Sequence, residues 1–196
     1  MILNLPNVLT LSRVAVIPVF VASFFLESPL ANWVALGLFI AAGATDYLDG
    51  FFARRREQSS DFGRFLDPIA DKLLVATALL MLAGFGRIAG VALIAAAIVL
   101  LREIVISGLR EYLGGLKITV PVSKLAKWKT TVQMVAIGFL IVGKAGPAAM
   151  PTVLVGEILL WAAAVLTIVT GYDYMRAGMR HILGRDDEAQ AGGAAE

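Results

Sequence analysis

Six long apolar runs, separated by short polar segments, constrain the fold of this chain more than any other feature of its sequence. They cover about residues 7–26, 33–52, 68–85, 88–109, 130–142 and 152–174, with an alternative start near Ser123 for the fifth. A helix needs about 20 apolar residues to cross the hydrocarbon core of a bilayer. Because 59% of the 196 residues are hydrophobic, against about 45–50% in soluble domains, we predict an all-α integral membrane protein with six transmembrane helices.

The polar segments predict the orientation of these helices and the limits of the domain. Basic residues gather after the second, fourth and sixth runs, whereas the opposite ends carry only Arg87 and Lys144. The positive-inside rule then puts both termini in the cytosol. We expect a membrane domain over 1–183 and a disordered tail over 184–196, which is acidic and then Ala/Gly-rich. The chain has no cysteine, which excludes disulfides and thiolate chemistry, and no nucleic-acid partner is expected.

Four aspartates flank the connection between the second and third runs. Asp46 and Asp49 end one run, and Asp67 and Asp71 begin the next. On helices, spacings of three and four put each pair on one face, about one turn apart. Four carboxylates brought close together repel one another unless cations lie between them. Because the ligands are all oxygens, the pattern predicts a site for Mg²⁺ or Mn²⁺ rather than zinc.

The wider pattern around the aspartates, D-x2-D-G-x2-A-R-x8-G-x3-D-x3-D, resembles the signature of the CDP-alcohol phosphotransferases, integral membrane enzymes of phospholipid synthesis. It is filled without a gap by Asp46, Asp49, Gly50, Ala53, Arg54, Gly63, Asp67 and Asp71. The resemblance implies that Asp46, Asp49 and Asp67 hold the metals. It implies that Asp71 is the general base and a further metal ligand. The acceptor hydroxyl would attack the β-phosphorus of a CDP-linked lipid, and CMP would leave.

The resemblance also implies a surface that binds the nucleotide and its diphosphate. Gly50 and Ala53 would let a nucleotide approach the helix closely, and Arg54 would meet phosphate. The expected members of this surface are Asn7, Thr10, Arg13, Asp49, Gly50, Ala53, Arg54 and Gly63. For Arg13 the alternative is that its side chain snorkels to the membrane surface.

Three further segments resemble the branch of the family whose acceptor is sn-glycerol 3-phosphate. They read N-L-P-N-V-L-T-L-S-R at 4–13, R-E-I-V-I-S-G-L-R-E at 102–111 and V-S-K-L-A-K-W-K-T-T-V-Q-M at 122–134. This resemblance implies that CDP-diacylglycerol is the donor. It also implies that the protein is a homodimer, surrounded by the lipids of a bacterial inner membrane. An anionic acceptor needs cations, so we expect Arg110 with Lys124 or Lys127 to bind its phosphate in a cytosol-facing polar cavity.

Several alternatives stay open at this point. Arg102 and Glu103 are costly inside a span; we interpret them first as ion pairs with other helices and second as acceptor ligands. The same chemistry could use inositol phosphate, serine or phosphatidylglycerol as acceptor. A cation channel or transporter would also use intramembrane aspartates, although the outer halves of these runs are almost purely apolar. A scaffold without catalysis would tolerate asparagine at the aspartate positions.

Overall fold

The computed structural model is helical, with no strand in the part of the chain that it describes. Its elements are α1 (Leu5–Ser23), α2 (Pro29–Arg56), α3 (Asp61–Gly84), α4 (Ala92–Gly115), α5 (Lys124–Val142), the 3₁₀ turn η1 (Gly143–Ala145) and α6 (Thr152–Gly193). The backbone is described over 5–193 apart from 27, 57–60, 117, 119 and 122–123. The side chains of 5–10, 46–56, 61–68, 71, 124 and 183–193 also lie outside the described set.

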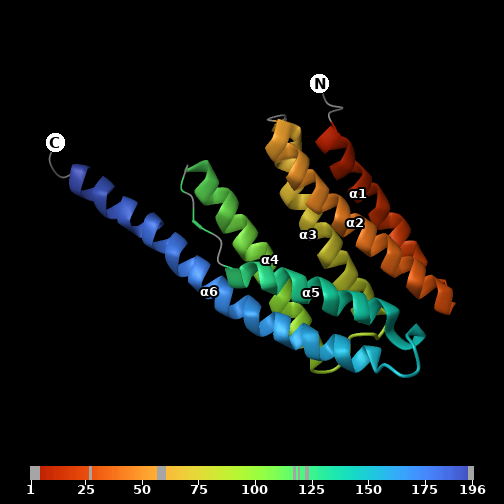
Figure 1. The fold of residues 1–196 in the computed structure, drawn as a ribbon. Helices are drawn as coiled ribbons and strands as arrows, with labels where there is room; N and C mark the ends of the chain where they lie inside the picture. The colour runs from red at the N-terminus through yellow and green to blue at the C-terminus, as the bar shows by residue number, and fades with distance from the viewer. Residues whose placement is uncertain are drawn as a thin grey trace.

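Consecutive helices alternate in direction (Figure 1). Both termini, the C-terminal ends of α2 and α4, and the N-terminal ends of α3 and α5 therefore lie toward one end of the bundle. We call it the aspartate end, because α2 carries Asp46 and Asp49 there and α3 carries Asp67 and Asp71. α5 and α4 both pack along α6, and α1 packs on α2 and α3.

Three of the helices are long and apolar enough to cross a membrane by themselves. These spans are Ala92–Gly115, Leu125–Ala145 and Thr152–Ile182. The apolar parts of the first three helices within the described side chains are shorter, at Leu11–Ser23, Pro29–Thr45 and Lys72–Gly84. The prediction of an all-helical membrane protein is confirmed to that extent, and six membrane crossings stay a prediction.

The polar segments contain more helix than predicted. α2 continues to Arg56, beyond the end of the second apolar run at residue 52, and α3 begins at Asp61, before the third run starts at residue 68. Arginine is a good helix former, and an aspartate is favourable at a helix N-terminus. As a result, the aspartates lie within the two helices rather than at their ends.

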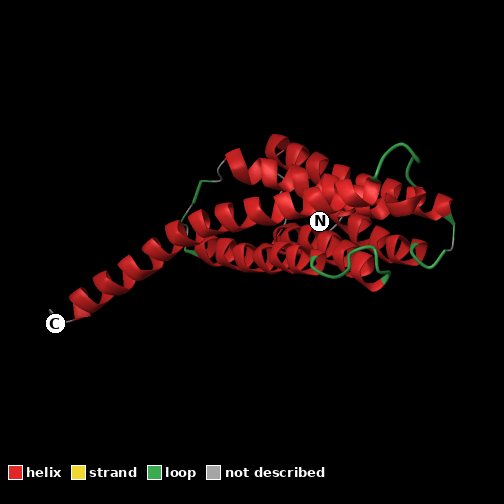
Figure 2. Cartoon of the chain, turned by 90° about the horizontal axis from the view of Figure 1, so that it is seen from below, coloured by secondary structure: helices red, strands yellow, loops and turns green. Residues whose placement is uncertain are grey.

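Two other boundaries also differ from the prediction. α4 begins at Ala92 rather than near residue 88, because the α3–α4 turn contains Gly86 and Gly90 with φ of 66° and 54°, a conformation that glycine adopts without strain. α6 runs to Gly193 and its C-terminal part projects beyond the other helices (Figure 2). The predicted division at residue 184 has no counterpart in the secondary structure and stays a prediction.

The core combines alanines, which let the helices approach closely, with branched aliphatic residues and the phenylalanines Phe20, Phe24 and Phe39. α3 contributes buried residues at helical spacing, namely Leu74, Val75, Ala78, Leu79 and Leu82. The facing helices contribute several alanines, and such small residues are typical of helix packing in membranes. At one contact the helices are so close that a Cβ on Gly156 of α6 would lie 2.7 Å from Leu140 Cγ of α5.

At the end opposite the aspartates, a single arginine ties several elements together. Arg87, in the α3–α4 turn, donates hydrogen bonds to Ile141 O and, at 2.6 Å, to Asn32 Oδ1. Asn32 Nδ2 in turn donates to Val142 O at 3.0 Å. The Arg87 guanidinium also lies 4.9 Å from the ring centroid of Phe24, and burial lowers its pKa from the ordinary value. Arg87 therefore has a structural role, far from the predicted site.

Candidate active site

The backbone brings the two aspartate pairs to neighbouring helices at the same end of the bundle. Asp46 and Asp49 lie in the C-terminal part of α2, Asp67 and Asp71 lie in the N-terminal part of α3, and the two helices contact each other. The four side chains lie outside the described residues, so a shared metal stays a prediction. Among the side chains that are described, no group of three His, Cys, Asp or Glu residues could hold a metal ion.

The predicted nucleotide-binding residues come from the same three helices. Their side chains lie outside the described residues for Asn7 and Thr10 on α1, for Asp49, Gly50, Ala53 and Arg54 on α2, and for Gly63 on α3. Arg13 on α1 is described, and only 2% of its surface is exposed. A snorkelling side chain would keep its charged end in water, so that alternative for Arg13 is wrong.

A polar cavity of about 260 Å³ lies between α3, α4 and α5, and we call it the α3–α5 cavity. Its charged lining residues are the cations Lys72, Arg102, Arg110 and Lys127 and the acid Glu103. The two predicted acceptor residues Arg110 and Lys127 thus meet at one cavity, while the side chain of Lys124 is not described. Lys72 directly follows Asp71 in the sequence. The excess of cations gives the cavity a positive potential that favours an anionic ligand.

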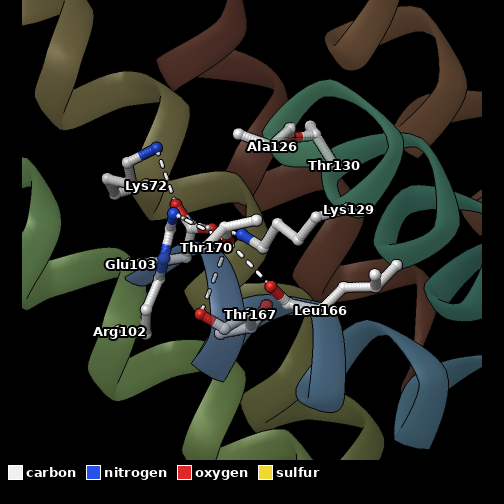
Figure 3. Close-up of polar contacts among 9 residues, drawn as sticks. All are labelled: Lys72, Arg102, Glu103, Ala126, Lys129, Thr130, Leu166, Thr167 and Thr170. Atoms are coloured by element: carbon white, nitrogen blue, oxygen red, sulfur yellow. Dashed lines mark hydrogen bonds and ion pairs between the residues drawn. The ribbon is translucent and has the colours of Figure 1, made fainter. Parts of the chain in front are cut away.

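Glu103 is the centre of an ion-pair network that joins three helices (Figure 3). Its carboxylate lies 2.9 Å from Lys72 Nζ of α3 and accepts a hydrogen bond from Lys129 Nζ of α5. Arg102, its neighbour on α4, has NH1 at 3.7 Å from Glu103 Oε1. The predicted pairing of Glu103 with other helices is confirmed.

Arg102 is held between α4 and α6. Its NH2 donates a hydrogen bond to Thr170 Oγ1 at 3.3 Å, and the Thr170 hydroxyl donates to Leu166 O at 2.7 Å. Glycine at 171 makes room for the arginine, because a Cβ there would lie 3.1 Å from Arg102 Cγ. Arg102 therefore contributes to the α4–α6 contact and to the wall of the α3–α5 cavity.

Three residues of this region have no role predicted from the sequence. Lys72 and Gln133 line the α3–α5 cavity, and Lys129, 1% exposed, is buried against Glu103. A lysine beside an apolar run is costly in a membrane unless it has a partner. The charge of Glu103 within an apolar run was therefore a usable signal that a lysine of another helix pairs with it, although not of which lysine. Gln133 carries no charge, and no comparable signal pointed to it.

An apolar groove of about 600 Å³ runs between α2 and α5, and we call it the α2–α5 groove. One part of its lining, Gly43 and Ala44, lies just before Asp46 in the sequence, and another part, Pro147 and Met150, follows η1 at the opposite end. Gly43 and Gly138 are small residues on the two facing helices. The groove thus extends along the bundle from the aspartate region and suits a hydrocarbon chain.

Comparison of the sequence with known proteins points to one family. The sequence model for CDP-alcohol phosphatidyltransferase matches residues 3–169, which include the four aspartates and the residues that line the α3–α5 cavity. The chain is similar to the CDP-diacylglycerol–glycerol-3-phosphate 3-phosphatidyltransferase of Rickettsia bellii, with 48% identity over 174 residues, 89% of this chain and 94% of that protein. Proteins of the same name from Pseudomonas fluorescens (41% identity, 92% of each chain) and Cereibacter sphaeroides (37% identity, 91% of this chain and 97% of that protein) are also similar.

Proposed function

This chain belongs to the CDP-alcohol phosphatidyltransferase family, and from that premise we propose that it transfers the phosphatidyl group of CDP-diacylglycerol to sn-glycerol 3-phosphate. The products are CMP and phosphatidylglycerol phosphate. Relatives that cover about nine tenths of the chain are named for this donor and this acceptor. The structural observation that supports this acceptor most directly is the excess of cations in the α3–α5 cavity, whose lining residue Lys72 directly follows Asp71 in the sequence.

In this proposal the α3–α5 cavity holds the acceptor. Its volume of about 260 Å³ is below the roughly 300–1,000 Å³ of sites for drug-sized ligands, and a three-carbon phosphate is a small ligand. Arg110 offers a planar fork of donors that matches phosphate oxygens. Lys127 contributes a second positive charge from the facing helix, and Lys124 is a further candidate.

The donor's diphosphate binds between α1, α2 and α3. Gly50, Ala53 and Gly63 let it approach the backbone, and Asn7, Thr10, Arg13 and Arg54 supply hydrogen bonds and positive charge. The family generally needs a divalent metal; here the proposed ion is Mg²⁺ or Mn²⁺, held by the carboxylates of Asp46, Asp49, Asp67 and Asp71. A donor set made only of oxygens fits these hard cations, and a bound ion neutralises charge on the diphosphate oxygens.

The chemical step moves one proton and exchanges one P–O bond. Asp71 accepts the proton of the acceptor's 1-hydroxyl, whose oxygen attacks the β-phosphorus of the donor. The bond from the β-phosphorus to the oxygen that bridges the two phosphates breaks, and CMP leaves with that oxygen. Lys72, fixed by Glu103 at 2.9 Å, places positive charge one residue from the base.

The membrane supplies the donor, whose acyl part occupies the α2–α5 groove while its head group reaches the aspartates. The aspartate end faces the cytosol of a bacterial cell, and the enzyme is a homodimer spanning its inner membrane with six helices. Because the chain has no cysteine, single cysteines test the orientation cleanly. An impermeant maleimide should label Lys144→Cys in intact spheroplasts. It should label Arg176→Cys only after the spheroplasts are permeabilised, and the reverse pattern would contradict the orientation.

The decisive experiment supplies purified protein with CDP-diacylglycerol, Mg²⁺ and labelled sn-glycerol 3-phosphate. We expect CMP release together with labelled lipid, and no comparable product with inositol phosphate, serine or phosphatidylglycerol. Arg110→Gln should raise the KM for glycerol 3-phosphate about 10-fold or more, because a hydrogen bond to a charged group contributes about 1.5–3 kcal/mol. The matched control is Lys144→Gln, an exposed cation at the opposite end of the bundle. Product with a different acceptor alone would overturn the proposal.

A further inference from the structure

The α3–α5 cavity contains one buried polar group that the proposed reaction does not use. Gln133 on α5 lines the cavity and is 2% exposed. Its side-chain oxygen, Oε1, is buried and accepts no hydrogen bond from any residue that the structure describes. Buried polar atoms in native proteins nearly always have a partner, so this oxygen requires a donor from a ligand or from water.

Other polar side chains on the walls already have partners within the protein. The Thr130 hydroxyl donates to Ala126 O at 3.2 Å, and Lys72 is paired with Glu103. Gln133 Oε1 differs from the cations of the cavity in the kind of ligand group that it can bind. The cations attract an anion, whereas Oε1 can only accept a hydrogen bond. A fully ionised phosphate cannot satisfy it, but a hydroxyl group can.

We propose that Gln133 is a specificity-determining residue, whose Oε1 accepts a hydrogen bond from the 2-hydroxyl of the acceptor. This inference rests on the proposed function, in which glycerol 3-phosphate occupies the cavity. The 1-hydroxyl gives its proton to Asp71 and the phosphate binds Arg110 and Lys127, which leaves the 2-hydroxyl as the donor without an assigned partner.

The spacing along α5 is compatible with a ligand of this size. Lys127 and Gln133 are six residues apart, or about 9 Å along a helix axis. Long side chains on a helix lean toward its N-terminus, and the N-terminus of α5 points to the aspartate end (Figure 1). The Lys127 side chain leans the same way, so a separation of about 9 Å remains for the ligand and its hydrogen bonds to span.

Two acceptor analogues test the proposed contact without changing the phosphate. 3-Hydroxypropyl phosphate lacks the 2-hydroxyl, and dihydroxyacetone phosphate carries a carbonyl at that position, so neither can donate to Oε1. A site built to bond a substrate hydroxyl rejects an analogue without it, because its own polar group is then left unpaired. We expect the wild-type enzyme to prefer glycerol 3-phosphate over either analogue by about 10- to 100-fold in kcat/KM.

The experiment measures kcat/KM for glycerol 3-phosphate and for 3-hydroxypropyl phosphate in three proteins. Gln133→Met keeps the length of the side chain and removes the acceptor atom, and it should bring the ratio of the two values close to one. Thr130→Val is the matched control: Thr130 lines the same cavity, but its hydroxyl already has a protein partner. This variant should keep the wild-type ratio.

An unchanged ratio in folded Gln133→Met overturns the inference and leaves the proposed function intact; this is the result expected if only water meets Oε1. The inference is also overturned if the wild-type enzyme uses both acceptors equally well. This measurement needs no variant, so it tests the inference even if Gln133→Met does not fold. No lipid product from the wild type with either acceptor would overturn the proposed function and the inference with it.

Discussion

Replacing Glu103 by glutamine removes the charge that joins α3, α4 and α5 while it keeps the size of the side chain. The carboxylate lies 2.9 Å from Lys72 Nζ and 3.7 Å from Arg102 NH1, and it accepts a hydrogen bond from Lys129 Nζ. The relative exposure of the side chain is 9% for Glu103 and 1% for Lys129. The substitution therefore removes the Glu103 charge from beside a buried ammonium group and leaves three cations near one another.

The expected loss follows from how deeply each partner is buried. Removing one partner of a buried ion pair costs about 3–5 kcal/mol, and Lys129 meets that condition. Lys72 is 29% exposed, so its pair with Glu103 adds at most about 1 kcal/mol. We expect Glu103→Gln to lower the free energy of unfolding by about 3–5 kcal/mol, and Lys129→Met to lower it less, because the carboxylate then keeps Lys72 and Arg102.

Equilibrium unfolding in mixed micelles, followed by the fluorescence of the three tryptophans, measures these differences. The double variant Glu103→Gln/Lys129→Met lacks both charges of the Glu103–Lys129 pair, and it should recover much of the stability that Glu103→Gln loses. Glu111→Gln is the matched control, an exposed acid on the same helix. A loss below about 1 kcal/mol in Glu103→Gln, or a double variant that is no more stable, would refute the reasoning.

Three further predictions follow from other parts of the molecule. Arg87→Ala should cost about 3–6 kcal/mol of stability, because two charged hydrogen bonds of about 1.5–3 kcal/mol each are lost, with kcat unchanged in the folded fraction; unaltered stability would contradict its structural role. Gly156→Ala should cost about 1–3 kcal/mol, because the new Cβ would lie 2.7 Å from Leu140 Cγ, whereas Gly84→Ala, with open space around it, should be close to neutral. Asp71→Asn should lower the rate of CMP release at least about 100-fold without loss of the fold; normal turnover would refute its assignment as the base.

The sequence predicts the helices well because apolar length is a local property. Each of the six apolar runs corresponds to one helix, and the family suggested by the aspartate pattern is confirmed by a match over residues 3–169. The polar boundaries were predicted less well, as Arg56 and Asp61 show. An arginine-rich segment can form either a loop or the end of a helix, and its hydropathy is the same in both cases.

The candidate site could be predicted only where its residues form a fixed pattern in one stretch of chain. Arg110 and Lys127 were chosen for charge, and they do line one cavity. The partners of Glu103 come from α3 and α5, and no spacing along the chain tells which of several lysines will reach it. That choice depends on the rotation of each helix about its axis, which tertiary packing decides.

Glu103 and Gln133 line the same cavity, but Glu103 has partners within the protein and the oxygen of Gln133 has none among the described residues. Substitutions at the two positions therefore distinguish an effect on stability from an effect on acceptor specificity. The carboxylate has cationic partners on several sides, so its removal weakens the bundle and disturbs the cavity at the same time. Gln133 Oε1 has no partner to lose among the described residues. Replacing a buried amide whose oxygen is unsatisfied by an apolar side chain of similar shape should cost little stability. Gln133→Met should therefore keep most of the stability of the wild type while it loses discrimination between acceptors. Such a result indicates a residue retained for its ligand, because a residue retained for packing would lose both properties together.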